Sequence, residues 1–504
     1  MFLVSLLFWA ACLWIAGRCF YNLYLHPLRS YPGPWLCRAS SLPRIWHRTV
    51  GTNISHAHHA HEKYGPVVRL SPGELSYINY DAWNDIYGRN DGNAALPKDP
   101  TFNSPSPDYP PGLVQVTDGP PHARQRRIFA PAFSNTSLMK QEAMLRGHVR
   151  KMVAKLQRAC DSASSSSSPS SGAELDISSF FNFLTFDVMA DLAFGAPLGL
   201  LDAGQYTPWV KNVFAVFRIL SLRAIILYYL PQLEGLMTRV LARPAMVAAR
   251  KAHIDYAAGL VDRRLDADAN AQTEERPDVW ALVEKKMDVL TREEMHINAA
   301  TFMAAGTETT ATALCGVVWF LARDGGAMGK VTEEVRGLSG GEEDLTMDTL
   351  ARLPYLNAVI NEAMRLYPPT PDMLYRLVPE GGAMVCGKLV PAGTVVGIHQ
   401  WPAYHSAHNF ARPEEFIPER WLPEASVKGE FVNDERRIVQ PFSRGPRSCI
   451  GKNLALHEMR LALASTLRQF DIVATDNSKD WMQRQKCHVV WEKPPLMMKV
   501  KPVV

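Results

Sequence analysis

A single cysteine near the C-terminus, set in a run of glycine, proline and basic residues, constrains this chain more than any other feature. The run is QPFSRGPRSCIGKNLA at positions 440–455, with Arg447 two residues before Cys449. A helix is expected to begin at Lys452, and the N–H groups at a helix N-terminus stabilise a thiolate, as a neighbouring cation does. We therefore predict that Cys449 is ionised.

A thiolate in this setting can act as a nucleophile, a zinc ligand or an iron ligand. The eight cysteines are scattered along 504 residues without a C-x-x-C pair, which supplies no zinc site and no disulfide framework. A catalytic cysteine needs a histidine base, which the sequence leaves open. A haem iron needs only one protein thiolate, and Gly445 and Gly451 would let the backbone approach such a large flat group.

The pattern Phe442-x-x-Gly445-x-Arg447-x-Cys449-x-Gly451 resembles the cysteine-ligand loop of the cytochrome P-450 superfamily. The resemblance implies that Cys449 is the axial thiolate ligand of haem b, iron protoporphyrin IX. It also implies that Phe442 packs beside the thiolate, that Arg447 pairs with a haem propionate, and that Gly451 lies against the cofactor.

A second pattern, Glu362-x-x-Arg365, places two opposite charges on one helix face. The same spacing recurs at 333–336, so its position before a Pro-Pro pair and upstream of the cysteine loop gives it weight. The P-450 resemblance implies that Glu362, Arg365 and Arg420 form a buried charged triad beneath the haem. Trp421 follows Arg420 where many members of the superfamily have phenylalanine.

A third pattern interrupts a long helical segment, expected over 292–323, with the polar turn AGTET at 305–309. Glycine and threonine weaken a helix, and a threonine hydroxyl can bond to a carbonyl one turn away. The segment resembles the distal helix of P-450 enzymes, whose turn forms an oxygen-binding groove. The resemblance implies that Thr309 delivers a proton during oxygen activation and that Glu308 helps to relay it.

Haem carries two propionates, so its site needs cationic or N–H donors. His122 and Arg126 in GPPHARQRRIF are spaced i, i+4 and can point the same way from a helix. The predicted donors are therefore His122, Arg126, Arg376 and Arg447. The family often has tryptophan at position 122. We interpret Arg127 as a surface charge.

The N-terminus is uncharged from Phe2 to Gly17 and stays apolar to about Leu25. About 20 residues at ~1.5 Å each span the hydrocarbon core of a bilayer. A cleaved signal peptide is the alternative, but no basic residue precedes the run and no small-x-small site ends it. Basic residues follow it instead, which places the rest of the chain in the cytosol; they are Arg18, Arg29, Arg38 and Arg44.

We therefore predict a single-pass anchor at 1–25, a Pro/Gly linker at 26–40 and a catalytic domain at 41–504. A Ser-rich stretch at 162–174 is expected to be a surface loop. The P-450 resemblance implies a fold that is mainly α with small β-sheets, and strand-like runs occur at 63–80, 381–398 and 489–501. The histidines of 56–61 are interpreted as a solvated helix face, with a metal site as the less favoured alternative.

The net charge of +4 and the absence of a long basic run exclude nucleic acid as an expected partner. The resemblance implies a monooxygenase of the endoplasmic reticulum membrane that hydroxylates or epoxidises a lipophilic molecule. Electrons would come from NADPH-cytochrome P-450 reductase, with cytochrome b5 as a further candidate. An isomerase or dehydratase acting on a peroxide and a non-catalytic haem protein are alternatives, and both are disfavoured because Glu308 and Thr309 are present.

The substrate pocket should draw on segments that carry no motif; these are 101–119, 206–230, the helix near Phe302 and Ala305, 370–374 and 483–487. The stretch FNSPSPDYPPG, 102–112, is expected to be a lid. The entry LYLHPLRSYPGPW resembles that of filamentous-fungal members, many of which serve secondary metabolism. This resemblance suggests a terpenoid, polyketide or alkaloid intermediate.

Overall fold

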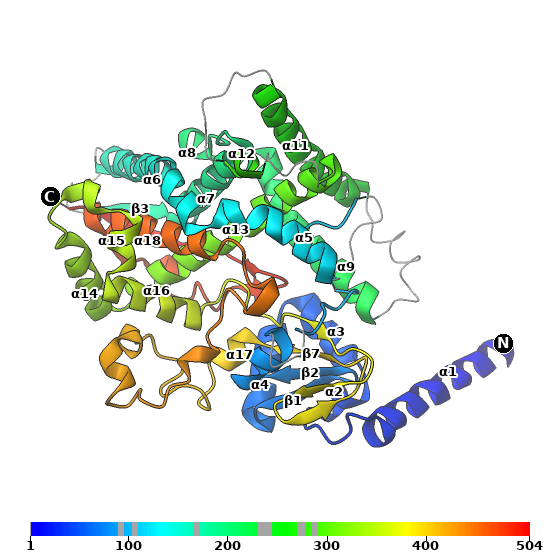
Figure 1. Cartoon of the computed structure of the whole chain (residues 1–504). Helices are drawn as coiled ribbons and strands as arrows, with labels where there is room; N and C mark the ends of the chain where they lie inside the picture. Colours follow the sequence, from blue (N-terminus) through cyan, green and yellow to red (C-terminus); the bar gives the residue numbers. More distant parts are fainter. Residues whose placement is uncertain are drawn as a thin grey trace.

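The computed structural model describes residues 2–88, 95–102, 109–117, 119–164, 172–229, 244–269, 278–283 and 290–503. Helices fill a large lobe, a small lobe carries a sheet, and α1 stands off from the small lobe (Figure 1). The sheets have two to four strands each. The predicted fold class, mainly α with small β-sheets, is confirmed.

A long helix, α13 (Arg292–Leu321), runs through the large lobe and begins with a reciprocal cap. The Thr291 hydroxyl accepts a hydrogen bond from the Glu294 N–H at 3.1 Å, and the Glu294 carboxylate accepts one from the Thr291 N–H at 3.1 Å. This pair satisfies two N–H groups that the first turn of a helix leaves open. The helix expected over 292–323 is confirmed and ends two residues earlier.

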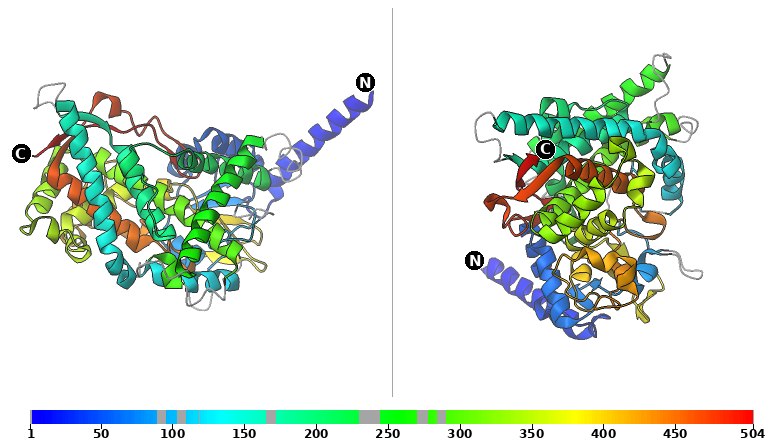
Figure 2. Two further views of the ribbon diagram at one scale, coloured as in Figure 1. Left: turned by 90° about the horizontal axis from the view of Figure 1, so that it is seen from above. Right: turned by 90° about the vertical axis from the view of Figure 1, so that its left-hand side faces the viewer.

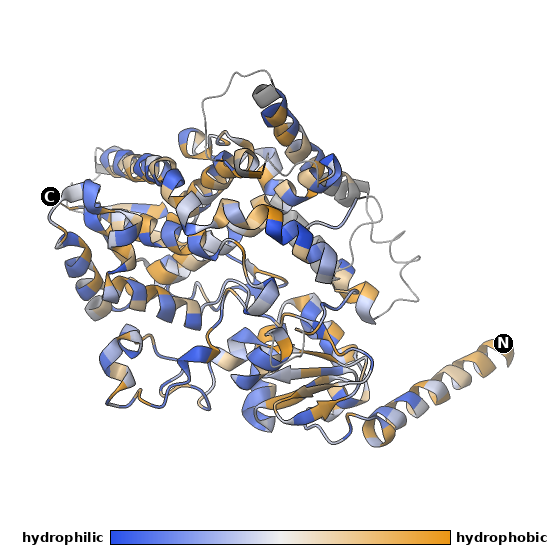
Figure 3. Cartoon of the chain, viewed as in Figure 1, coloured by the Kyte–Doolittle hydropathy of each residue, from blue (hydrophilic) through white to orange (hydrophobic). Residues whose placement is uncertain are grey.

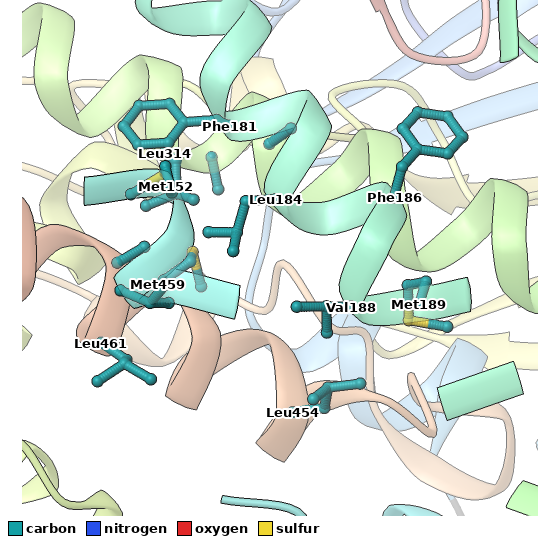
Figure 4. Close-up of a cluster of buried hydrophobic side chains, with 14 of the residues drawn as sticks. Met152, Phe181, Leu184, Phe186, Val188, Met189, Leu314, Leu454, Met459 and Leu461 are labelled. Carbon is teal, nitrogen blue, oxygen red and sulfur yellow. The ribbon is translucent and has the colours of Figure 1, made fainter. Parts of the chain in front are cut away.

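Apolar side chains bury α13 against α7 (Ile177–Phe194) and α18 (Lys452–Gln469), and α6 (Asn135–Ser164) packs on both of these helices. Figure 4 shows part of this core, with Leu314 of α13, Phe181 and Leu184 of α7, and Met459 of α18 drawn as sticks. Burying side chains of this size contributes about 1.5–3 kcal/mol each, so this core fixes the helix that carries the AGTET turn.

The remaining helices cover this core or the small lobe; they are α2 (Trp35–Ala39), α3 (Leu42–Val50), α4 (Asn53–Tyr64), α5 (Gly119–Phe129), α8 (Leu200–Ala203), α9 (Pro208–Tyr229), α11 (Pro244–Ala269), α12 (Val279–Val283), α14 (Gly325–Arg336), α15 (Met347–Ala351), α16 (Pro354–Leu366) and α17 (Gln400–Tyr404).

The sheet of the small lobe has the order β1-β2-β7-β4, in which β2 and β7 run parallel and the other neighbours antiparallel. The hairpin predicted within 63–80 is confirmed as its first two strands. The strands are β1 (Val67–Ser71), β2 (Glu74–Tyr77), β7 (Val395–Ile398) and β4 (Arg376–Leu377).

Most strands of the other sheets come from the C-terminal half of the chain. One of these sheets joins the C-terminal strand to the strand that directly precedes α7. Its order is β3-β11-β8, all antiparallel. The strands of these sheets are β3 (Ala173–Asp176), β11 (Met497–Pro502), β8 (Phe470–Ala474), β5 (Ala383–Val385), β6 (Lys388–Val390), β9 (Lys486–Cys487) and β10 (Trp491–Glu492).

Two predicted boundaries differ from the structure. The linker expected at 26–40 ends in helix α2, because the chain turns back to pack beside β1. The Ser-rich loop expected at 162–174 begins as the last turn of α6 and ends in β3, while 165–171 lie outside the described residues.

Two helices are long and apolar enough to span a membrane by length and composition. One, Ile177–Phe194, is mostly buried and is the core helix α7. The other, Phe2–Leu25, consists of α1 (Phe2–Phe20) and one wider turn, and its apolar surface faces away from the protein (Figures 2 and 3). This exposed apolar helix supports the predicted membrane anchor.

Arg44, one of the basic residues that the sequence placed beside the anchor, does not lie on the surface. It is fully buried, and its guanidinium pairs with Glu74 at 2.6 Å. The positive-inside rule counts the charges of the inserting chain, so burial of Arg44 in the folded protein leaves the topology a prediction.

Candidate active site

The Cys449 loop is closed by its own backbone, because the N–H of Cys449 donates to the Phe442 carbonyl at 2.8 Å. Gly445 has a φ of +73°, and a side chain there would collide with the Tyr87 carbonyl oxygen. Among the described residues, nothing lies within 4 Å of the place a Gly451 side chain would take. Gly445 thus serves the protein's own packing instead of the approach of a bound group, whereas Gly451 leaves space for one.

The Cys449 side chain is exposed at the surface of the loop. The surrounding protein nevertheless removes water from the thiol and thereby raises its pKa. The Gly451 N–H and the charges of Arg126 and Lys452 pull this pKa down and offset only part of the rise. The loop by itself therefore does not favour the thiolate, and the ionisation of Cys449 stays a prediction. A bound metal ion deprotonates a coordinating thiol, so metal coordination would complete what the loop begins.

Five basic side chains from four segments meet beside this loop: Lys98, His122, Arg126, Arg376 and Arg447. Burial and the other four charges lower the pKa of His122 to about 4. Burial, with Arg376 and Arg447, lowers the pKa of Lys98 to about 7. The structure thus brings together all four predicted propionate donors and adds Lys98, which belongs to no motif. Burial and mutual repulsion disfavour the charged forms of such a cluster, and a bound anion would stabilise them.

Two of these arginines also fasten the loop. Arg126 Nη1 donates to the Ser448 carbonyl at 2.7 Å, and its Nη2 lies 3.3 Å from the Ser448 hydroxyl. Arg447 donates to the carbonyls of Val116 and Thr117. The two residues that precede the predicted ligand are therefore held to α5 and to the segment before it, which fixes the position of the thiol.

On α13, the Thr309 hydroxyl donates to the Ala305 carbonyl at 2.6 Å. Gly306 stands where a side chain would come within 2.6 Å of Met189 Sδ on α7. The small residues of the AGTET turn thus let α7 and α13 approach closely, a packing role that the sequence did not predict for Gly306.

The Glu308 side chain does not join Thr309. It is buried, forms an ion pair with Lys493, and lies 3.5 Å from the Thr312 hydroxyl one turn further along. Neighbouring residues in a helix are separated by about 100° around its axis, so Glu308 and Thr309 face different sides of α13. The structure leaves these two predicted catalytic residues apart, and Lys493 was absent from the prediction.

The predicted triad is assembled and fully buried. Glu362 accepts hydrogen bonds from Arg365 at 2.9 and 2.8 Å and from Arg420 at 3.0 Å. Burial raises the pKa of Glu362, but the hydrogen bonds and charge of Arg365 and the charge of Arg420 leave it below its ordinary value. Trp421 Nε1 also donates to Glu362, at 2.8 Å. The departure from phenylalanine at position 421 therefore adds a hydrogen bond to the triad.

A cavity of about 490 Å³ lies beside α13 and is partly lined by Lys98, Arg376 and Arg447 of the basic cluster. Ile297, Ala300, Ala304 and Ala305 form one of its walls; further lining comes from 101–102, 114–115, Arg223, Leu227 and 370–375. These positions fall in four of the five segments predicted to form the pocket.

The rest of the pocket prediction differs. Phe302 points into the core, where its ring packs edge-on against Phe129 and Phe133. The C-terminal contribution comes from His488 and Val489 instead of 483–487. The predicted lid at 102–112 falls largely on 103–108, which lie outside the described residues.

The histidines of 56–61 form no metal site in the described part of the chain, where no group of three potential ligands occurs. His61 is buried and lies 2.6 Å from the Ser76 hydroxyl and 2.9 Å from the Gly65 carbonyl. His58 is 3.6 Å from Glu62. His61 is therefore a core residue, in contrast to the predicted solvated face.

The sequence model of the cytochrome P450 family matches residues 36–500 of the chain. The chain belongs to the cytochrome P450 family. It is 42% identical to cytochrome P450 monooxygenase efuB of Hormonema carpetanum over 95% of its own length and 93% of that protein's. It is 38% identical to cytochrome P450 monooxygenase FUM2 of Gibberella moniliformis, over 95% and 98%, and 37% identical to astJ of Aspergillus oryzae, over 97% and 95%.

Family membership makes this cytochrome P450 a haem-containing oxidoreductase, and the residues of its site fit that cofactor. The exposed Cys449 thiol, the open space at Gly451 and the basic cluster match an iron, a flat ring and two carboxylates. Lys98, Arg376 and Arg447 of this cluster line the same cavity as Ala304 and Ala305 of α13.

Proposed function

We propose that this cytochrome P450 is a membrane-anchored haem-thiolate monooxygenase that inserts one oxygen atom into a lipophilic small molecule of a fungal secondary-metabolite pathway. The observation that carries the proposal is the exposed Cys449 thiol beside a cluster of five basic side chains, in which burial and neighbouring charges lower the pKa of Lys98 and of His122. Such an arrangement suits a group that brings a metal for the thiol and anions for the cations.

Each residue then has a definite task. Cys449 would hold the haem iron, and the basic cluster would bind the propionates, with Arg126 and Arg447 also fixing the loop. When bound, haem supplies the redox and oxygen-activating chemistry. Thr309, oriented by its bond to the Ala305 carbonyl, would deliver a proton at the distal side. The buried charged triad of Glu362, Arg365 and Arg420 would keep the fold beneath the cofactor rigid.

The substrate is proposed to be a terpenoid, polyketide or alkaloid intermediate that is hydroxylated or epoxidised. Alanines of α13, with Leu227 and Met373, give the cavity apolar walls that suit such molecules. The named relatives are fungal monooxygenases, which favours oxygen insertion over the isomerase or dehydratase alternative.

Oxygen insertion needs two electrons from a redox partner. We propose NADPH-cytochrome P-450 reductase as that partner, with cytochrome b5 as an additional donor, in the endoplasmic reticulum membrane. The exposed apolar helix α1 supports the membrane placement, since it would hold the enzyme in the bilayer that carries the reductase.

The cofactor assignment is tested by the spectrum of the reduced protein with carbon monoxide. Thiolate ligation gives a red-shifted Soret band, and the Cys449→His variant should lose it. A band typical of histidine ligation in the wild-type protein would overturn the assignment of Cys449.

The proton-delivery assignment is tested by Thr309→Ala. This variant should still bind haem and consume NADPH, while a larger share of the electrons ends in hydrogen peroxide instead of oxidised product. Thr310→Ala, at the next position of α13, serves as the matched control. Normal coupling in Thr309→Ala would contradict the assigned role.

A further inference from the structure

Arg48 of α3 is a charged residue in the wall of the cavity beside α13 to which the proposed function gives no task. It lines that cavity, and its side chain is only 5% exposed. Its Nε is buried without a hydrogen-bond partner in the described part of the chain. A buried N–H of a charged group is costly while it remains unpaired. This atom therefore requires an acceptor that the described residues do not supply.

Aromatic contacts hold the Arg48 side chain in place. Its guanidinium lies over the rings of Phe102 and Tyr375, at 4.7 and 5.0 Å from the ring centroids. Arg48 Nη1 also donates to the Tyr375 hydroxyl. An arginine that is stacked and bonded in this way loses little further freedom when it binds a ligand, so its free N–H is preorganised.

The carboxylate of Asp372 lies beside Arg48 but is held mainly by other donors. Its Oδ2 is 3.5 Å from Arg48 Nη1, which is beyond the usual hydrogen-bond distance. Its Oδ1 accepts from the Asn53 amide and from the Met373 N–H, both at 2.8 Å, and lies 3.2 Å from His399 Nε2. Asp372 therefore leaves the Nε–H of Arg48 available to a ligand.

Arg48 is also separate from the basic cluster that would bind the haem propionates. Burial and two arginines of that cluster lower the pKa of Lys98, and Arg48 is not one of them. The guanidinium of Arg376 lies over the ring of Tyr87, at 4.8 Å, whereas Arg48 lies over the ring of Tyr375. Neighbouring residues of an extended segment point to opposite faces, so Tyr375 and Arg376 serve different sides of this segment.

The charges in the cavity wall favour an anionic ligand. The lining includes the basic side chains of Arg48, Lys98, Arg376 and Arg447, against the carboxylate of Asp372 in the described part of the chain. Positive charge stays in excess even when two propionates lie beside the cluster. A wall of this sign attracts a carboxylate and repels a cationic amine.

We propose that Arg48 is a specificity-determining residue that binds a carboxylate of the substrate, so that this enzyme takes a lipophilic carboxylic acid. The proposal rests on the proposed monooxygenase function and names the substrate class of the same cavity. The Nε–H of Arg48 donates to a carboxylate oxygen, and the apolar part of the molecule packs against the alanines of α13. Fixing the acidic end limits the carbon atoms that can reach the haem side of the cavity.

Calorimetric titration of the holoenzyme tests the proposal with decanoic acid and decanol, which share an apolar chain and differ in charge. At a pH where the acid is ionised, the wild-type enzyme should bind it about tenfold more tightly than the alcohol. Arg48→Met should weaken binding of the acid alone and remove this difference, whereas Arg48→Lys should retain part of it. A wild-type enzyme without a preference for the acid would overturn the proposal.

Further arms of the titration separate recognition from support of the cavity wall. Arg150→Met removes an arginine of α6 that is 55% exposed and does not line the cavity, so both affinities should stay unchanged. Equal weakening of the acid and the alcohol by Arg48→Met would show that Arg48 only supports the wall and would refute its role. Tighter binding of decyl phosphate than of decanoic acid would contradict a carboxylate site.

Haem retention distinguishes this site from the cofactor site. Arg48→Met should transfer haem to an excess of an acceptor protein at the wild-type rate, and faster transfer would make Arg48 a propionate donor instead. If the reduced protein with carbon monoxide lacks the thiolate Soret band, the proposed function fails. If the band is present and the preference for decanoic acid is absent, only the role of Arg48 fails.

Discussion

Lys98 shows how a single residue can belong to a site without belonging to a motif. It pairs with Arg376 through an isolated antiparallel bridge, and its ammonium group donates to the Val114 carbonyl at 2.6 Å. Its pKa falls to about 7 because of burial and the charges of Arg376 and Arg447. An anion bound at the cluster would offset the free-energy cost of keeping Lys98 charged, so Lys98 is expected to stabilise bound haem.

Replacing Lys98 by methionine should therefore speed haem loss by about tenfold, which corresponds to ~1.4 kcal/mol for one charge-assisted contact. The measurement is the rate of haem transfer to an excess of an acceptor protein. Lys140→Met, at an exposed position of α6, is the matched control. Equal rates for Lys98→Met and the control would remove Lys98 from the propionate site.

The haem-free protein gives a pH test of the same residue. Because the folded-state pKa of Lys98 is about 7 and its ordinary value is 10.5, the unfolded chain binds the extra proton between these values. Below about pH 7 the folded protein bears the full free-energy cost of the Lys98 charge. This cost falls as the pH rises toward 10.5, so the free energy of unfolding increases with pH over this range. Lys98→Met should flatten this dependence in denaturant titrations; an unchanged slope would contradict the depressed pKa.

At the scale of elements, α16 and the short helical turn Pro418–Trp421 are joined by the triad and by Trp421. Arg365 also donates to the carbonyls of Tyr404 and Pro413, at 2.7 and 2.6 Å, so one residue of α16 fixes the end of α17 and a loop. The Trp421 N–H satisfies an oxygen of Glu362 that a phenylalanine would leave without this donor. This element should consequently be sensitive to replacement of Trp421 by phenylalanine.

We expect Trp421→Phe to destabilise the protein by about 1.5–3 kcal/mol, the usual contribution of a hydrogen bond to a charged group. The shift in the denaturant midpoint of the holoenzyme measures the effect. Trp35→Phe is the control, since Trp35 is 66% exposed and has no such partner to lose. A Trp421→Phe midpoint equal to that of the control would mean that Glu362 finds another donor.

At the scale of the whole molecule, the apolar anchor continues onto the small lobe. Four large side chains of α2 and α3 are more than half exposed; they are Trp35, Leu36, Leu42 and Trp46. These helices follow α1 closely in the chain, and α2 contacts α1. Apolar and aromatic side chains at such a surface favour the interfacial region of a bilayer.

Deleting residues 2–25 should therefore weaken membrane binding without abolishing it. Sedimentation with lipid vesicles should retain part of the truncated protein, and changing Trp35, Leu36 and Trp46 to glutamine in that form should release it. The same changes at Val473 and Val489, exposed elsewhere, provide the control. Complete release after the deletion alone would confine membrane binding to α1.

Predictions drawn from short stretches of sequence succeeded where the physics is local. The start of α13, the hairpin of β1 and β2, and the contact between Glu362 and Arg365 depend on residues within a few positions of one another. Predictions that depended on burial failed, as with His61 and Phe302. The direction in which a side chain points relative to the core is set by packing between distant segments, which spacing alone does not encode.

The sequence by itself determined the family, the cysteine at its centre and the basic residues around that cysteine, because these follow from residue types at fixed spacing. The tertiary structure decided which of those residues meet. It brought Lys98 to the basic cluster and Lys493 across 185 positions to Glu308, and it separated Glu308 from Thr309 on α13. The physical reason is that a buried charge requires a partner, and the partner is supplied by whichever segment the packed core places beside it.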